Sequence, residues 1–348
     1  MTEYWWAYLS VMLGTVALSA GLAAIVSEVV SRLNMFYSWS DFKLPSHGIH
    51  AAAITATFVI AVPASSMIQP LAGGREGFAA VLVITVALFV AGLVEEQFKL
   101  LRSWCLGANI AGATVVWAIG GGVMLQGQIP AVVGLGLTVL WFVMIIDAFR
   151  LIDGTGGFST GLTAIACLSI FAIALSNGQV LLAVLSIAFA GCILGALAHS
   201  RESSHMFLGK GGTQLAGFLV AYFGLRLFRV NSNFIVSALI PILICSVVLF
   251  NWLVVLAGRV LLEQASTIKE RYSLSYWLLS IGCRPPVALA ILYLGASAAG
   301  MSAYLMNRTD SIIGLSIASL VGLSFLGIGV RLFQISQARQ SESRISAR

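Results

Sequence analysis

The chain has 348 residues, of which 59% are hydrophobic and only 9% are charged. A globular domain in water needs more charged surface than this, so the composition excludes a water-soluble protein and indicates a membrane protein. The net charge of +6 is explained by basic loops at an anionic membrane surface, and it does not indicate nucleic-acid binding.

Apolar segments long enough to cross a bilayer follow one another along most of the chain. A transmembrane helix needs about 20 mostly apolar residues, and lipid offers no partner for unpaired backbone groups. The fold is therefore expected to be an all-α polytopic bundle of about eleven transmembrane helices. The predicted spans are 7–30, 50–69, 78–94, 104–124, 130–147, 161–177, 179–198, 213–228, 234–257, 286–306 and 311–333.

Basic residues are distributed unevenly between the two sides of this bundle. If the N-terminus lies outside, 15 of the 19 Lys and Arg residues fall on the inner side, and only Arg75, Arg226, Arg229 and Arg308 fall outside. Because basic loops are retained in the cytoplasm, we expect an N-out, C-in protein whose cytoplasmic loops form the site. Residues 1–333 are expected to form a single transmembrane domain, and residues 334–348 a basic cytoplasmic tail.

Ionisable residues at the inner ends of the spans are the most informative, since they are expensive in lipid. They form four clusters. The first cluster contains Glu95 and Glu96, in the sequence GLVEEQFKLLR. The second contains Arg150 and Asp153, in DAFRLIDGTGGFSTG, and the third has Lys210 in the Gly-rich turn of FLGKGGTQLAGF. The fourth is the segment 259–286, which includes ERYSLSYWLLSIG. Taken singly, paired carboxylates are usually a solvated helix cap, and a Gly-rich turn that could cradle phosphate is a weak signal.

Together and in this order, the clusters resemble the motifs of the polyprenyl-phosphate N-acetylhexosamine-1-phosphate transferases, which belong to glycosyltransferase family 4. DAFRLIDGTGGFSTG looks like NAFNLIDGxDGLAGG, and FLGKGGTQLAGF looks like FMGDxGSxxLGF. GLVEEQFKL is similar to GLxDDxxxL, and ERYSLSYWLLSIG is similar to DRxHIHHRLLxxG. The family's N-terminal elements survive at most as a trace in the segment 41–50.

The resemblance implies a transfer of sugar-1-phosphate from a UDP-N-acetylhexosamine to undecaprenyl phosphate, with Mg²⁺ or Mn²⁺, at the inner leaflet of a bacterial cytoplasmic membrane. Such a reaction brings two anionic phosphates together and therefore needs cationic groups. A homodimer, or a heteromer with an active homologue, is also implied. The family-equivalent catalytic positions are Glu95, Glu96, Asp153 and Lys210, with the two glutamates as metal candidates. The phosphate or nucleotide positions are Arg150, Gly209, Gly212, Arg271, Ser273 and Ser275.

Several charged positions depart from the family pattern. The family's Asp pair is Glu95 and Glu96, the Asn before LIDG is Arg150, and the second Asp of that motif is Gly156. The metal-binding Asp of the third motif is Lys210. At about 4 Å and an effective dielectric of about 20, a carboxylate is attracted to a divalent ion by about 8 kcal/mol, and an ammonium is repelled by a similar amount. We therefore expect that Lys210 and Mg²⁺ do not share that site.

The histidine motif is also changed, to Ser273, Leu274, Ser275 and Tyr276. Neutral hydroxyls can hydrogen-bond phosphate, but they supply neither positive charge nor an acid near neutral pH. Glycine and apolar positions are retained while charged positions change, which favours a retained scaffold without the ordinary catalytic site.

We expect Lys210 and Arg150 to lie where the metal and substrate would bind, paired with Glu95, Glu96 and Asp153. The favoured interpretation is a non-catalytic paralogue that acts as a partner subunit or binds the lipid phosphate or nucleotide sugar. The alternative is a divergent but active transferase in which Lys210 replaces part of the metal's charge. A transporter or channel is disfavoured because ionisable residues are nearly absent from the middle of the spans.

Overall fold

The computed structural model describes residues 5–36, 51–60, 75–98, 102–120, 130–153, 157–199, 208–227, 234–261, 273–309, 313–324 and 327. Regular secondary structure within these residues is helical, as the sequence predicts. Arg271, Gly156, the segment 41–50 and the tail 334–348 lie outside them. The chain divides into two compact units, Met1–Val230 and Asn231–Arg348, which we describe separately. A single transmembrane domain over residues 1–333 stays a prediction.

Six of the described helices are long and apolar enough to cross a membrane, and a bent pair counts as a seventh if its halves form one broken span. The chain is therefore a polytopic all-α membrane protein, while the predicted number of spans and their orientation stay predictions. The six are Trp6–Ile25, Ala80–Phe98, Ala131–Ile152, Phe158–Ser176, Val180–Ala198 and Pro285–Arg308.

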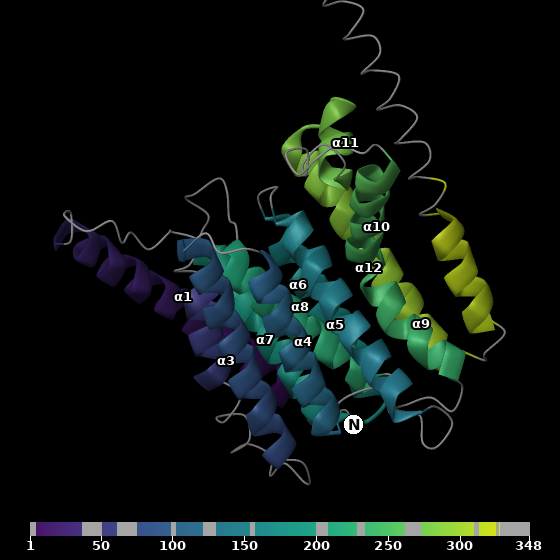
Figure 1. Cartoon of the computed structure of the whole chain (residues 1–348), viewed down its shortest axis with the longest axis horizontal. Helices are drawn as coiled ribbons and strands as arrows, with labels where there is room; N and C mark the ends of the chain where they lie inside the picture. Colours follow the sequence, from purple (N-terminus) through teal and green to yellow (C-terminus); the bar gives the residue numbers. More distant parts are fainter. Residues whose placement is uncertain are drawn as a thin grey trace, which may run out of the picture. The chain divides into compact units, whose positions relative to one another are not determined.

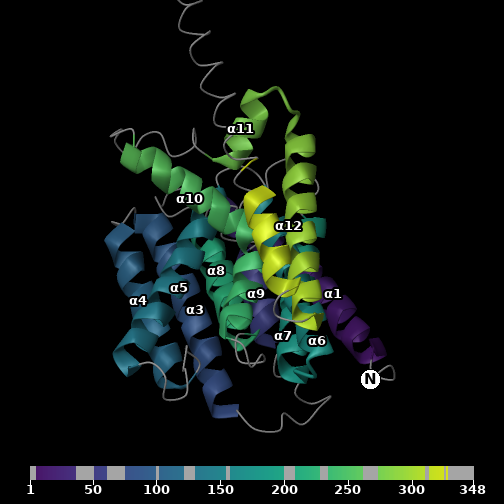
Figure 2. The ribbon, with the colours of Figure 1, turned by 90° about the vertical axis from the view of Figure 1, so that its right-hand side faces the viewer.

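The first unit is a helical bundle (Figures 1 and 2). Most of its helices run side by side, whereas α1 crosses them obliquely and packs against α7. The helices are α1 (Trp5–Phe36), the short helix Ala51–Ile60, α3 (Arg75–Phe98), α4 (Arg102–Ala118), α5 (Ala131–Ile152), α6 (Phe158–Ser176), α7 (Val180–His199) and α8 (Gly209–Leu227).

Helix α8 lies inside this bundle, where it packs against α3, α5 and α6. Every residue from Gly211 to Leu225 is buried. A helix enclosed by other helices needs no lipid-facing apolar surface, so its first two turns can carry Lys210 and Gln214. Those polar residues are the reason that α8 is not among the most apolar helices, although it forms the core of the unit.

The packing of α5 on α8 sets the register that brings charged residues together. The rings of Phe142 and Phe218 stack with their centroids 5.2 Å apart. A Cβ at Gly217 would lie only 2.7 Å from the Cα of Ile146, so the two backbones approach closely there. Phe142, Ile146 and Arg150 recur every four residues and share one face of α5. One further turn therefore places Arg150 beside the beginning of α8.

The second unit contains a bent helix pair. Helices α9 (Phe234–Ile244) and α10 (Ser246–Leu261) meet at an angle of 80°. Pro241 lies inside α9, one turn before this bend. The short α11 (Leu274–Ser280) and α12 (Pro285–Arg308) follow, and α12 packs against α9, α10 and α11. A final described helix covers Ile313–Ser324.

Candidate functional site

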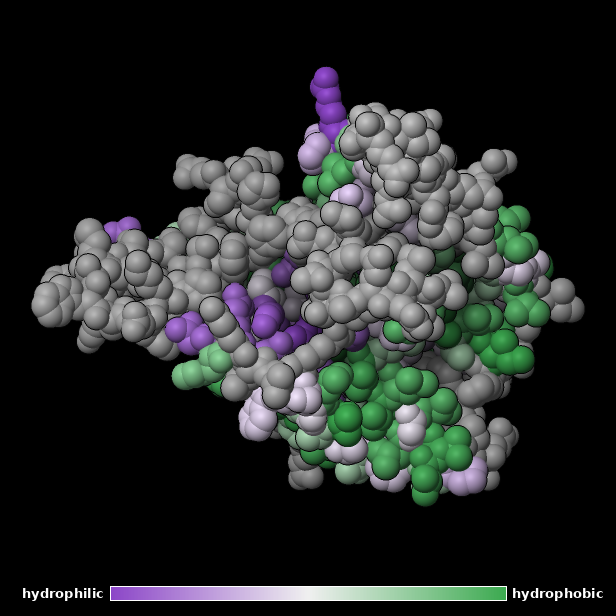
Figure 3. Space-filling view, turned by 45° about the horizontal axis from the view of Figure 1, so that its top comes forward, coloured by the Kyte–Doolittle hydropathy of each residue, from purple (hydrophilic) through white to green (hydrophobic). Residues whose placement is uncertain are grey.

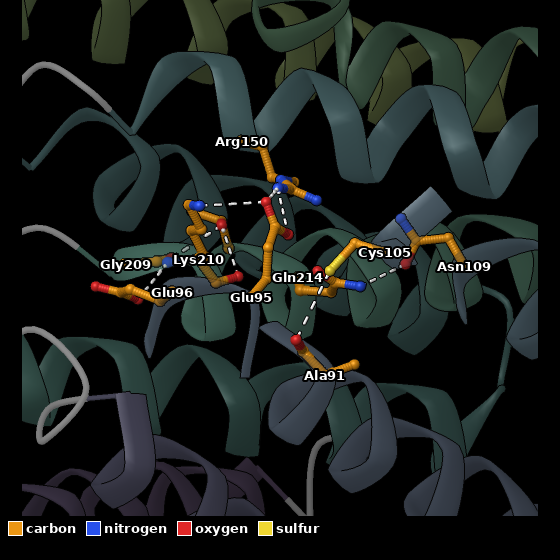
Figure 4. A network of polar contacts seen from close by, with 10 residues as sticks. Ala91, Glu95, Glu96, Cys105, Asn109, Arg150, Gly209, Lys210 and Gln214 are labelled. Atoms are coloured by element: carbon orange, nitrogen blue, oxygen red, sulfur yellow. Dashed lines mark hydrogen bonds and ion pairs between the residues drawn. The ribbon is translucent and has the colours of Figure 1, made fainter. Parts of the chain in front are cut away.

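The carboxylate of Glu95 joins three helices of the first unit (Figure 4). Nη2 of Arg150 on α5 donates to both carboxylate oxygens, at 2.6 and 2.7 Å. Nζ of Lys210 on α8 lies 3.2 Å from Oε1 of the same carboxylate. The structure thus brings together Glu95, Arg150 and Lys210, which are far apart in the sequence, as one ion-pair cluster.

The three members of this cluster differ in exposure. The side chain of Glu95 is 4% exposed and that of Arg150 is 13% exposed, whereas Lys210 is 44% exposed. A carboxylate this buried is costly without a paired charge, and Arg150 supplies that charge through two short hydrogen bonds. Arg150 is therefore the buried partner of Glu95, and Lys210 adds a second cation that reaches the surface.

Glu96 and Asp153 hold the beginning of α8. The backbone N–H of Lys210 donates to Oε2 of Glu96 at 3.1 Å, and the N–H of Leu208 donates to Oδ1 of Asp153 at 3.1 Å. The Ser159 hydroxyl also donates to Oδ1 of Asp153. The first N–H groups of a helix lack intrahelical partners, and negative charge is favourable at this end. These two carboxylates therefore cap the beginning of α8.

The glycines of this turn have structural roles. Gly209 has φ +67°, a left-handed conformation that favours glycine. A Cβ at Gly212 would lie 3.0 Å from the Cβ atoms of Ala51 and Leu208, so this position is tightly packed. Because two N–H groups at this end already donate to carboxylates, part of the predicted phosphate cradle is used within the protein. A phosphate contact at Gly209 and Gly212 stays a prediction.

The approach of α3 to α8 depends on Gly92. A Cβ at this position would lie 2.6 Å from the Cα of Gly211 and 2.8 Å from the carbonyl oxygen of Lys210. We predict that Gly92→Ala forces the helices apart and lowers the unfolding free energy by about 1–3 kcal/mol. Gly107→Ala is the control, because no atom lies within 4 Å of the added Cβ. Thermal unfolding in detergent tests this, and equal midpoints for the two variants would contradict it.

A second polar contact lies one turn deeper, between residues that the sequence did not single out. Nε2 of Gln214 donates to Oδ1 of Asn109 at 2.6 Å, and both side chains are buried. Gln214 follows Lys210 by four residues on α8, and Asn109 follows Cys105 by four on α4. A spacing of four residues places the two side chains of each helix on one face, so a polar residue at this spacing in an otherwise apolar helix could have indicated the contact. The pair ties α4 to α8 beside the ion-pair cluster (Figure 4).

Ser273 and Ser275 belong to the second unit and are buried there. Ser273 caps α11 by accepting from the N–H of Tyr276 at 3.2 Å, and its hydroxyl lies 2.9 Å from that of Ser275. The N–H of Leu274 donates to Oδ1 of Asn251 at 2.8 Å. The two hydroxyls thus take part in internal contacts, and their predicted role in phosphate binding stays a prediction.

The residues around Glu95 do not fit the divalent cation that the resemblance implies. Mg²⁺ needs oxygen ligands at about 2.0–2.1 Å in near-octahedral geometry. Both oxygens of Glu95 already accept from Arg150, and Lys210 adds a further positive charge beside them. Within the described ranges, no group of three or more His, Cys, Asp or Glu residues could hold a metal ion.

Comparison with known proteins shows what the segment around this site is similar to. Residues 78–228 match the family model "Glycosyl transferase family 4". Over 181 residues the chain is 29% identical to a Bacillus subtilis protein named "Probable undecaprenyl-phosphate N-acetylglucosaminyl 1-phosphate transferase", covering 52% of this chain but only 50% of that relative. It is 25% identical over 289 residues to the "Decaprenyl-phosphate N-acetylglucosaminephosphotransferase" of Mycolicibacterium smegmatis, covering 72% of this chain and 70% of the relative.

The Mycobacterium tuberculosis protein of the same name is 25% identical over 323 residues, covering 81% of this chain and 78% of the relative. The matched segment 78–228 contains helices α3 to α8 and thus all of the ion-pair cluster. Through this segment, the chain is similar to glycosyl transferase family 4.

Proposed function

We propose that this protein is a polyprenyl-phosphate N-acetylhexosamine-1-phosphate transferase by ancestry that does not catalyse the transfer itself. It acts instead in a bacterial cytoplasmic membrane as a binding subunit for undecaprenyl phosphate or a UDP-N-acetylhexosamine, or as the partner of an active homologue. The names of its relatives support the substrate class. The segment matched by the family model carries the cluster, which supports a site at these positions.

The observation that carries this proposal is the contact of Lys210 with Glu95. By resemblance, Glu95 is a metal candidate and Lys210 stands at a position where the family has a metal-binding Asp. Here Nζ of Lys210 lies 3.2 Å from the carboxylate, and Arg150 holds both of its oxygens. Two monovalent cations thus occupy the surroundings of the carboxylate that a divalent ion would need. The expected consequence is loss of metal-dependent chemistry at this position.

UMP release tests the proposal. The purified protein is assayed in detergent with undecaprenyl phosphate and a panel of UDP-N-acetylhexosamines, with Mg²⁺, with Mn²⁺ and with EDTA. The Mycolicibacterium smegmatis relative is assayed beside it under the same conditions. We expect no metal-dependent UMP release above the rate without protein. Metal-dependent turnover by the wild-type protein would overturn the proposal.

The exposure of Lys210 favours a second candidate function, an active transferase in which the ammonium replaces part of the metal's charge. Its side chain is the most exposed of the three in the cluster, so its charge is accessible to a substrate phosphate. This alternative predicts UMP release that persists in EDTA and is abolished by Lys210→Met. The proposal of a non-catalytic protein predicts no UMP release by the wild-type protein, either with a divalent metal or in EDTA.

A further inference from the structure

We propose that Arg150 and Lys210 together stand in for a divalent cation on Glu95, and that the Lys210 ammonium binds a phosphate group directly, without metal. This inference rests on the binding role proposed above and narrows it, because it names the chemical group that is bound and the side chain that binds it. The phosphate belongs to a lipid monophosphate or to the diphosphate of a nucleotide sugar.

The charge of the cluster supports this assignment. Mg²⁺ in phosphate-binding sites is typically held by one or two carboxylates and completes its coordination with substrate phosphates. A divalent ion on one carboxylate leaves one unit of positive charge for the ligand. Arg150 and Lys210 on the single carboxylate of Glu95 leave the same surplus. The tethered cations therefore offer a phosphate the net charge that a metal would offer.

The contacts within the cluster leave its excess positive charge on Lys210. Arg150 neutralises Glu95 through both carboxylate oxygens, and both side chains are largely buried. An ammonium has three N–H donors. Within the described residues, the Lys210 ammonium makes one ion pair, to Oε1 of Glu95. Further donors on a partly exposed side chain are thus available to an anion.

The neighbouring carboxylates do not remove this charge. Glu96 accepts from the backbone N–H of Lys210, and Asp153 accepts from the N–H of Leu208, so both face the positive end of α8. These amides offset part of their negative charge. Figure 3 brings forward the end of the molecule that is uppermost in Figure 1, and hydrophilic side chains gather on that face. The Lys210 side chain is 44% exposed, so its ammonium is accessible to a charged group.

Binding by the purified full-length protein, measured by isothermal titration calorimetry, tests the inference. The probes are farnesyl phosphate, UDP-N-acetylglucosamine and inorganic phosphate, with farnesol as the uncharged control. Each is titrated in EDTA and again in Mg²⁺. We expect at least one phosphate compound to bind with the same affinity in both conditions. Preference for farnesyl phosphate identifies a lipid ligand, preference for UDP-N-acetylglucosamine a nucleotide ligand, and equal binding of inorganic phosphate a free anion.

Substitutions then assign the contact to Lys210. Lys210→Met should weaken phosphate binding about ten-fold or more, because a charge-assisted hydrogen bond is lost. Lys210→Arg keeps the charge and should retain most of the affinity. Arg308→Gln removes the same charge from a contact with the Tyr304 ring in the second unit, and should leave affinity unchanged. Because Glu95 keeps Arg150, Lys210→Met is expected to remain folded, which its unfolding midpoint verifies.

Three results would overturn the inference: binding only when Mg²⁺ is present, equal binding of farnesol and farnesyl phosphate, or unchanged affinity in Lys210→Met. These outcomes are separate from those that concern the proposed function. Metal-dependent UMP release would refute a non-catalytic role and leave metal-free phosphate binding standing. If the protein releases no UMP and binds phosphate compounds only when Mg²⁺ is present, this inference is refuted and the proposed non-catalytic function is not.

Discussion

Glu95→Gln is expected to lower the unfolding free energy by about 3–5 kcal/mol, because it leaves buried positive charge without its counter-ion. Arg150 makes both of its short contacts with this one carboxylate, and its side chain is only 13% exposed. A neutral amide of the same size can accept from Arg150 but cannot balance the charge. Thermal unfolding in detergent, followed by tryptophan fluorescence, measures the change in midpoint.

Two matched variants separate the loss of the buried pair from general damage. Lys210→Met removes the exposed partner only, so its effect should be about 1 kcal/mol or less. Glu95→Gln combined with Arg150→Met removes both buried charges, and it should be more stable than Glu95→Gln alone. If Glu95→Gln unfolds at the wild-type temperature, Glu95 does not hold the three helices together as the structure indicates.

The double reversion Arg150→Asn with Lys210→Asp is expected to create a divalent-metal site, whereas Lys210→Asp alone is not. In the single variant, Arg150 still holds both oxygens of Glu95 and repels a divalent ion at that carboxylate. Removing both cations frees Glu95 and adds a carboxylate beside it. Electron paramagnetic resonance of added Mn²⁺ measures the bound ion, and we expect about one equivalent in the double variant only.

The control for this prediction is Lys210→Asp combined with Arg308→Asn, which removes an arginine of the second unit and should bind no more Mn²⁺ than Lys210→Asp. Equal Mn²⁺ affinity in Lys210→Asp and in the double reversion would show that Arg150 does not control the carboxylate. Arg150→Asn would then have no effect on Mn²⁺ binding, although Arg150 and Lys210 both contact Glu95.

The helical membrane fold could be predicted from the sequence because long apolar segments have few other stable structures in lipid. The buried position of α8 could not be predicted in this way. Its first two turns, with Lys210 and Gln214, look like an exposed helix end, and only the packing of α8 against α3, α5 and α6 shows that the helix lies inside the bundle. The 80° bend between α9 and α10 was also missed, because hydropathy does not register a change in helix direction.

The ion pairs of the candidate site could be predicted from the sequence, because they depend on the signs of the charges at the motif positions. Opposite charges at corresponding motif positions indicate pairing, and the structure places Lys210 and Arg150 on Glu95. The use of Glu96 and Asp153 as caps of α8 was not predicted, since capping depends on which helix begins beside a carboxylate in space. The catalytic and phosphate-binding roles of all these positions remain predictions, because packing contacts do not report chemistry.

An experimental structure of the wild-type protein prepared with Mn²⁺, with anomalous scattering recorded at the manganese edge, tests the central claim most directly. We predict no anomalous peak at Glu95, with Nζ of Lys210 in contact with the carboxylate and Arg150 on both of its oxygens. A manganese peak bound by Glu95, with Lys210 turned away, would contradict the account.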